Sequence, residues 1–95
     1  KNSIIVNTAR GGIINEDDLE KALNENLIFG AALDVFSKEP IENNNPLINN
    51  KKVILSPHSA TFTDECTSRM GIETTKNIID FFENKIDKSM IVKYD

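Results

Sequence analysis

Short apolar runs separated by polar turns predict three strands. Residues 3–7 (SIIVN) are β-branched and apolar on both parities, which is typical of a strand that is buried on both faces of a parallel sheet. A second apolar stretch covers residues 27–36, and residues 52–56 (KVILS) predict a third buried strand that ends at Pro57. The polar residues 37–45 between them, with Pro40, predict a loop.

Two segments have the helical spacing of apolar residues. Asn15 is a good N-cap for a short helix that runs to about Asn24, and the acids at residues 16–18 favour the positive end of its dipole. Thr63 is the expected cap of a longer helix. The apolar stripe of that helix predicts core positions, namely Cys66, Met70, Ile78 and Phe81, widened by Ile72, Ile79 and Phe82. After Asn84 we expect a short extended tail that ends at residues 90–92.

The order is therefore strand, helix, strand, loop, strand, helix. Strands that alternate with helices favour right-handed crossovers and a parallel sheet. The prediction is an α/β fold, specifically half of a doubly wound domain.

Composition narrows the class of protein. The net charge of -4 argues against nucleic acid or an anionic membrane as the main partner. The one cysteine cannot form an internal disulfide, so we expect an intracellular protein. No apolar run approaches the roughly 20 residues of a membrane span, and we identify no signal peptide. Because the chain opens on Lys1 and enters an apolar run at once, we interpret it as a fragment of a longer protein.

Polar residues of several kinds follow the ends of the predicted strands. Arg10 follows the first, Asp34 and Glu39 follow the second, and His58 follows the third. The carboxyl ends of parallel strands meet at one edge of a sheet, where ligands collect. Taken singly, these residues have ordinary interpretations, such as a solvated arginine, a surface glutamate or a structural histidine. Asp34 is the exception, because a carboxylate at the end of an apolar strand must find hydrogen-bond donors.

Other features favour purely structural roles. A lone Cys66 and a lone histidine cannot make a metal site, so we expect no metal. The pair Gly11-Gly12 precedes a helix, but the spacing is neither GxGxxG nor that of a P-loop. The acids at residues 16–18 are interpreted as helix-start charges.

Several blocks in order give the chain a specific likeness. They are residues 7–12 (NTARGG), 30–36 (GAALDVF), 39–40 (EP), 46–47 (PL) and 56–60 (SPHSA). This set resembles the D-isomer-specific 2-hydroxyacid dehydrogenases and covers nearly the whole chain. The resemblance implies that residues 1–95 are the C-terminal half of a Rossmann-type, NAD-binding domain. The glycine-rich loop and the separate substrate domain of the family are absent from this sequence, so this chain alone is expected to be inactive.

The resemblance also implies roles for individual residues. Arg10 would bind the substrate carboxylate and carbonyl, His58 would be the general acid/base, and Glu39 would pair with that histidine. Asp34 would hold the nicotinamide carboxamide. The nicotinamide pocket would be lined by Thr8, Ala9, Arg10, His58 and Ala60.

Elementary chemistry agrees with these roles. Reduction of a 2-keto acid brings a hydride to C2 while the carbonyl oxygen needs a proton, which a histidine can supply. A carboxylate beside the ring stabilises the imidazolium, and a bidentate arginine anchors the substrate carboxylate.

Three functions remain open at this point. The first is an NAD-dependent oxidoreductase of D-2-hydroxy acids, with NADP as an alternative cofactor, cytoplasmic and homodimeric. The second is a corepressor-like scaffold that binds NAD(H), because such members of the family retain the same residues. The third is an inactive fragment that dimerises. The sequence does not identify which 2-hydroxy acid is the substrate.

Overall fold

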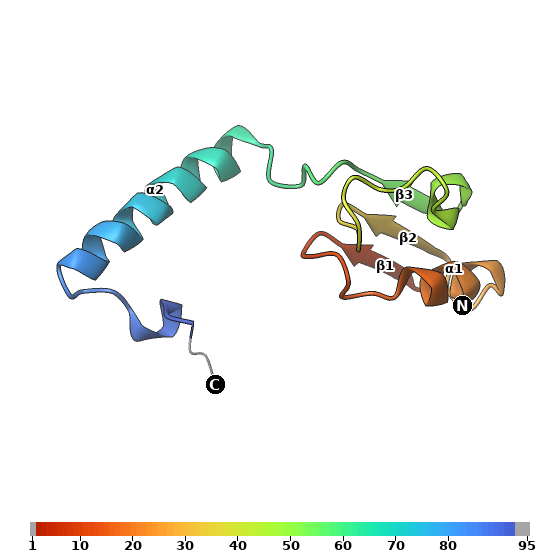
Figure 1. Ribbon diagram of the computed structural model, residues 1–95, viewed down its shortest axis with the longest axis horizontal. Coiled ribbons are helices and arrows are strands. Elements are labelled where there is room, and N and C mark those ends of the chain that lie inside the picture. Colours follow the sequence, from red (N-terminus) through yellow and green to blue (C-terminus); the bar gives the residue numbers. More distant parts are fainter. Residues whose placement is uncertain (1, 93–95) are drawn as a thin grey trace. The chain divides into compact units, whose positions relative to one another are not determined.

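The computed structural model describes residues 2–92, and the chain divides into two compact units, Lys1–Ala60 and Thr61–Asp95. The first unit contains β1 (Ile4–Asn7), α1 (Glu16–Asn24), β2 (Gly30–Leu33), η1 (Pro46–Asn49) and β3 (Val53–Leu55), and the second contains α2 (Asp64–Phe82) and η2 (Lys88–Met90) (Figure 1). Both η elements are short 3₁₀ helices. No helix in the described part of the chain is long and apolar enough to cross a membrane.

The three strands form a parallel sheet in the order β1-β2-β3, as the α/β prediction requires. The register pairs Asn7 with Leu33 and Leu33 with Leu55. The carboxyl ends of all three strands therefore lie in one row, and the segments that follow them start from the same edge of the sheet.

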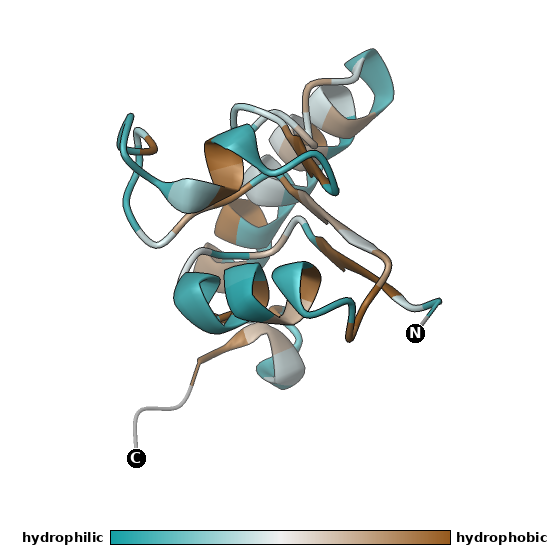
Figure 2. Ribbon diagram, turned by 90° about the vertical axis from the view of Figure 1, so that its right-hand side faces the viewer, coloured by the Kyte–Doolittle hydropathy of each residue, from teal (hydrophilic) through white to brown (hydrophobic). Residues whose placement is uncertain are grey.

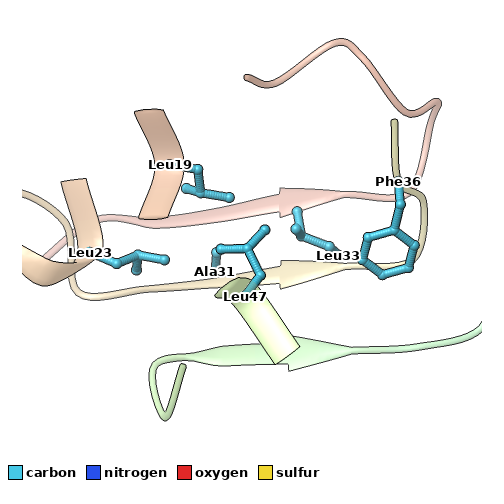
Figure 3. Close-up of a cluster of buried hydrophobic side chains, with 6 residues drawn as sticks. All are labelled: Leu19, Leu23, Ala31, Leu33, Phe36 and Leu47. Atoms are coloured by element: carbon cyan, nitrogen blue, oxygen red, sulfur yellow. The ribbon is translucent and has the colours of Figure 1, made fainter. Parts of the chain in front are cut away.

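The core lies on one face of this sheet. Both crossovers advance in the same direction across the sheet, so right-handed connections place α1 and η1 on the same side. Leu19 and Leu23 of α1 and Leu47 of η1 meet the β2 face there (Figure 3). Leu23 and Leu47 are fully buried, with no exposed surface.

The prediction that the strands are buried on both faces is wrong for this chain. One cross-strand row, Val6–Ala32–Ile54, runs over the second face of the sheet. Val6 is 65% exposed and Ile54 is 73% exposed, because no element of residues 2–60 covers that face. Figure 2 shows the apolar character of these strands, which contrasts with the polar loops around them.

Both helix caps are confirmed. The Asn15 side chain accepts from the Asp18 N–H, and the Thr63 side chain accepts from the Cys66 N–H. The predicted core positions of α2 are wrong, because no residue of α2 is buried: Met70 is 51% exposed, Phe81 is 60% exposed, and Cys66 is half-buried. Within residues 61–92 the only other element is the single turn η2, which offers the stripe no second layer.

Two segments differ from their predicted form. The turn η1 was not expected, although its Asn45 cap accepts from the Leu47 N–H and its Pro46 suits a helix start. In the predicted extended tail, the Asp87 side chain accepts from the Ser89 N–H at 2.8 Å and begins η2. Local side-chain capping therefore forms a helical turn in both segments, and in the tail it outweighs the predicted extended form.

Candidate active site

A histidine–carboxylate pair lies at the carboxyl edge of the sheet. The Nδ1 of His58 is 2.7 Å from Oε2 of Glu39, and both side chains remain partly open to solvent. The other oxygen of Glu39 accepts from the Phe36 N–H at 3.0 Å. That backbone hydrogen bond, followed by the one from His58, holds the pKa of the Glu39 carboxyl below its usual value. Glu39 is therefore ionised at neutral pH, accepts from Nδ1–H, and leaves Nε2 of the ring to exchange a proton.

The pair borders a hollow with apolar walls. Its lining consists of Phe36, Pro40, Ile41 and Pro57, together with Glu39 and His58. The acid–base pair thus supplies the ionisable groups of a hollow that is otherwise formed by apolar side chains. Such a combination of apolar walls with few polar groups is typical of a small-molecule site.

Asp34 fastens the segment that carries His58. Its carboxylate is buried and accepts from the Ser56 hydroxyl at 2.5 Å and from the Ser59 and Ala60 N–H groups, each at 2.9 Å. These hydrogen bonds, the one from the Ser56 side chain first, lower the pKa of Asp34. The expectation that this carboxylate finds donors is confirmed. The same bonds support His58 in the left-handed backbone region, at a φ of 53°.

Arg10 lies in a turn that the buried side chain of Asn7 organises. Oδ1 of Asn7 accepts from the Ala9 N–H at 3.1 Å, and its Nδ2 donates to the Arg10 carbonyl at 3.0 Å. The Arg10 guanidinium folds back and donates to the Ala9 carbonyl at 2.7 Å. Within residues 2–92 it makes no hydrogen bond or ion pair with Glu39 or His58. The turn nevertheless leaves Thr8, Ala9 and Arg10 exposed at the same edge.

The Arg10 turn and the Glu39 loop touch through backbone atoms. A Cβ on Gly11 would lie 1.8 Å from the Phe36 carbonyl oxygen, so only glycine permits this approach. Phe36 in turn donates to Glu39. The segments after β1 and β2 are therefore in direct contact, and His58 joins them through Glu39.

Two residues that organise this edge were not identified from the sequence. Asn7 shapes the Arg10 turn, and Glu16 accepts from the Ser37 N–H at 2.6 Å and from Asn45 Nδ2 at 2.8 Å. Interpreting Glu16 as only a helix-start charge was incomplete. Its partners lie 21 and 29 residues away, and no local pattern signals contacts at such distances. Among the described residues, no cluster of His, Cys, Asp or Glu could hold a metal ion.

The family model described as "D-isomer specific 2-hydroxyacid dehydrogenase, NAD binding domain" matches residues 1–60. The chain belongs to this family. Membership confirms the likeness found in the NTARGG, ALDVF and SPHSA blocks, and the Rossmann-type α/β class of the sheet with it.

Individual members of this dehydrogenase family are similar over most of the chain. A glyoxylate reductase of Aeropyrum pernix is 42% identical over 91 residues, which are 96% of this chain and 27% of the relative. The NADPH-dependent glyoxylate/hydroxypyruvate reductase of Sinorhizobium meliloti, solved with NADP and malonate, has a TM-score of 0.71 at 31% identity and is matched over 85% of this chain and 25% of its own. A glyoxylate reductase of Paecilomyes thermophila has a TM-score of 0.70 at 33% identity, over 95% of this chain and 26% of its own. The chain thus spans about a quarter of the length of these relatives.

Proposed function

We propose that this chain is part of an enzyme that interconverts a D-2-hydroxy acid and its 2-keto acid with NAD or NADP. Residues 1–95 would then be the C-terminal half of its dinucleotide-binding domain. The observation that carries the proposal is the 2.7 Å contact between His58 and Glu39 at the carboxyl edge of the sheet. Family membership supports it, because the same residues stand in the blocks that define the likeness.

The cofactor would meet this chain only at its nicotinamide end. The sequence holds no GxGxxG loop for a pyrophosphate, whereas the edge offers the exposed residues Thr8 and Ala9 and the segment that ends at Ala60. Asp34 has three of its roughly four lone-pair positions occupied, which leaves one to accept from a carboxamide. One remaining acceptor position fits the N–H of a neutral carboxamide. When bound, NAD(H) supplies or accepts the hydride.

The residues of this chain would manage the proton and the substrate charge. His58 Nε2 would give a proton to the carbonyl oxygen in reduction and take it from the hydroxyl in oxidation. Glu39 would orient the ring through Nδ1 and stabilise the imidazolium. Arg10 would anchor the substrate carboxylate and favour the negative charge that builds on the carbonyl oxygen.

A small 2-keto acid of the size of glyoxylate is the substrate we propose. The relatives compared above are reductases of such acids, and this favours an enzyme over a corepressor-like scaffold and over an inactive, dimerising fragment. A cytoplasmic homodimer remains part of the proposal. Sedimentation of the full-length protein would test the dimer.

A steady-state assay of the full-length protein tests the activity. We expect glyoxylate or hydroxypyruvate to oxidise NADH or NADPH. His58→Ala should lower kcat by about 10²–10⁴-fold, because a general acid is lost. Arg10→Ala should lower both substrate binding and turnover. Absence of hydride transfer to every 2-keto acid tried would contradict the proposal and favour the scaffold.

A further inference from the structure

Glu16 connects the start of α1 to both ends of the loop that carries Glu39. Its Oε1 accepts from the Ser37 N–H, and its Oε2 accepts from Nδ2 of Asn45. Ser37 and Asn45 are the first and last residues of the polar segment 37–45. One carboxylate therefore ties a nine-residue loop to a helix whose apolar face is anchored in the core.

Apart from Glu16, the loop is held by Ile41, which packs against the core, and by a hydrogen bond from the Asn45 N–H to the Glu42 carbonyl. Most of residues 37–45 are exposed. Fixing the backbone of such a segment in one conformation costs about 1–2 kcal/mol of conformational free energy per residue. Inside it, Lys38 and Glu42 form an exposed ion pair, which is a weak constraint. The two hydrogen bonds to the charged Glu16 are stronger than bonds between neutral groups, and they lower the pKa of its carboxyl against the opposing, largest effect of burial.

The connection leads directly to the histidine. Ser37 lies next to Phe36, whose N–H binds Oε1 of Glu39, and Oε2 of Glu39 contacts His58. A loop released from Glu16 would carry Glu39 away from the position in which both of its oxygens are satisfied. The effect on the ring would then be indirect, through Glu39.

We propose that Glu16 is a positioning residue that holds the Glu39 loop so that the Glu39 carboxylate reaches His58. The inference rests on the proposed function only for its catalytic consequence; the positioning itself concerns this chain alone. Glu16 touches no reacting atom in this account. Its role is to set the distance between Glu39 and the ring.

Exchanging the carboxylate of Glu16 with the amide of Asn45 tests the proposal. Glu16→Gln turns the Asn45 contact into two facing amide donors, whereas Asn45→Asp creates two facing carboxylates. The double variant E16Q/N45D restores one donor and one acceptor with the direction reversed, and its residue 45 can still cap η1. Asp17→Asn is the matched control, because it removes the same charge from the same helix turn without any side-chain hydrogen bond among residues 2–92.

The first readout is NMR of the 95-residue chain. His58 is its only histidine, so its ring signals are unambiguous, and the Phe36 amide reports the bond to Glu39. We expect both sets of signals to move in the two single variants, with Asn45→Asp the larger, and to return in E16Q/N45D. Asp17→Asn should leave them in place. Failure of the exchange to restore the signals, or an equal shift in the control, overturns the proposal.

The second readout is glyoxylate reduction by the full-length enzyme. Glu16→Ala should lower kcat by about tenfold with little change in the KM of the cofactor. It should also move the pH profile of kcat/KM in the same direction as Glu39→Gln does. Once Glu39 is replaced, Glu16→Ala should add nothing further. Additive losses would mean that Glu16 acts independently of Glu39 and would overturn the proposal. An enzyme without any activity would refute the proposed function, while the NMR result would still decide the positioning role.

Discussion

The two units of the chain use similar apolar patterns with opposite results. In the first unit, the stripe of α1 packs against β2, and Leu19 and Leu23 are almost completely buried. In the second unit, α2 has 19 residues, against 9 in α1, yet none of the residues of α2 is buried. Both helices begin at a well-formed side-chain cap. Caps and periodicity therefore predict that a helix forms, whereas burial depends on a second layer that the pattern does not reveal.

Truncation of a leucine in the first unit should give the largest effect. Leu23→Ala removes a fully buried side chain and should lower the free energy of unfolding by about 2–5 kcal/mol. Ile79→Ala in α2, where the side chain is 50% exposed, should change it by less than about 0.5 kcal/mol. Urea titrations of the chain, followed through amide signals of β2, measure both. Similar losses would show that α2 is packed as tightly as α1.

Replacing either of two glycines by alanine should change the free energy of unfolding, in opposite directions at the two positions. Gly11→Ala places a Cβ against the Phe36 carbonyl and should cost about 1–3 kcal/mol, because two backbone segments must separate. Gly71 lies inside α2, and a Cβ there meets nothing within 4 Å. Gly71→Ala should therefore stabilise the helix by about 0.5–1 kcal/mol through its higher helix propensity. The same titrations, with amide exchange of α2 added, test the pair. A stabilising Gly11→Ala would contradict the close approach.

Acid should destabilise the first unit through the carboxylates at the polar edge of its sheet. The pKa values of Asp34 and Glu39 are lowered by hydrogen bonds, so the unfolded chain binds more protons than the folded one at acid pH. The stability that these two carboxylates contribute is fully present above pH 4.5, the usual pKa of a glutamate. It is lost as the pH falls through their lowered pKa values. Asp34→Asn should reduce this pH dependence, measured as the slope of the unfolding free energy below about pH 4.5. An unchanged slope would mean that Asp34 contributes nothing to it.

The sequence predicts the strands and the helix starts of the chain better than their contacts. Short apolar runs identify the three strands, and Asn15 and Thr63 mark both helix starts, because these signals lie within a few residues of the structure that they specify. The strands are shorter than predicted, because the cross-strand pairing covers only residues 4–7, 30–33 and 53–55. Leu47, fully buried in η1, was hidden in a segment whose polar neighbours resemble a loop.

The same distinction holds at the candidate site. The ordered motifs predict Arg10, Glu39 and His58 as site residues, and the topology brings their segments to one edge. Asn7 and Glu16 were missed, because an amide or a carboxylate near a turn has many ordinary uses, and the partners of Glu16 are set by tertiary structure. The backbone conformation of His58 depends likewise on Asp34, a residue of the preceding strand end.

The pH dependence of the proposed glyoxylate reduction, measured on the full-length protein with Glu39→Gln, tests the central claim most directly. If Glu39 stabilises the protonated ring of His58, its loss leaves fewer molecules able to donate a proton as the pH rises. The alkaline limb of the kcat/KM profile should therefore move to lower pH, with Asp17→Asn unchanged as the control. A profile whose alkaline limb coincides with that of the unmodified enzyme would contradict the account.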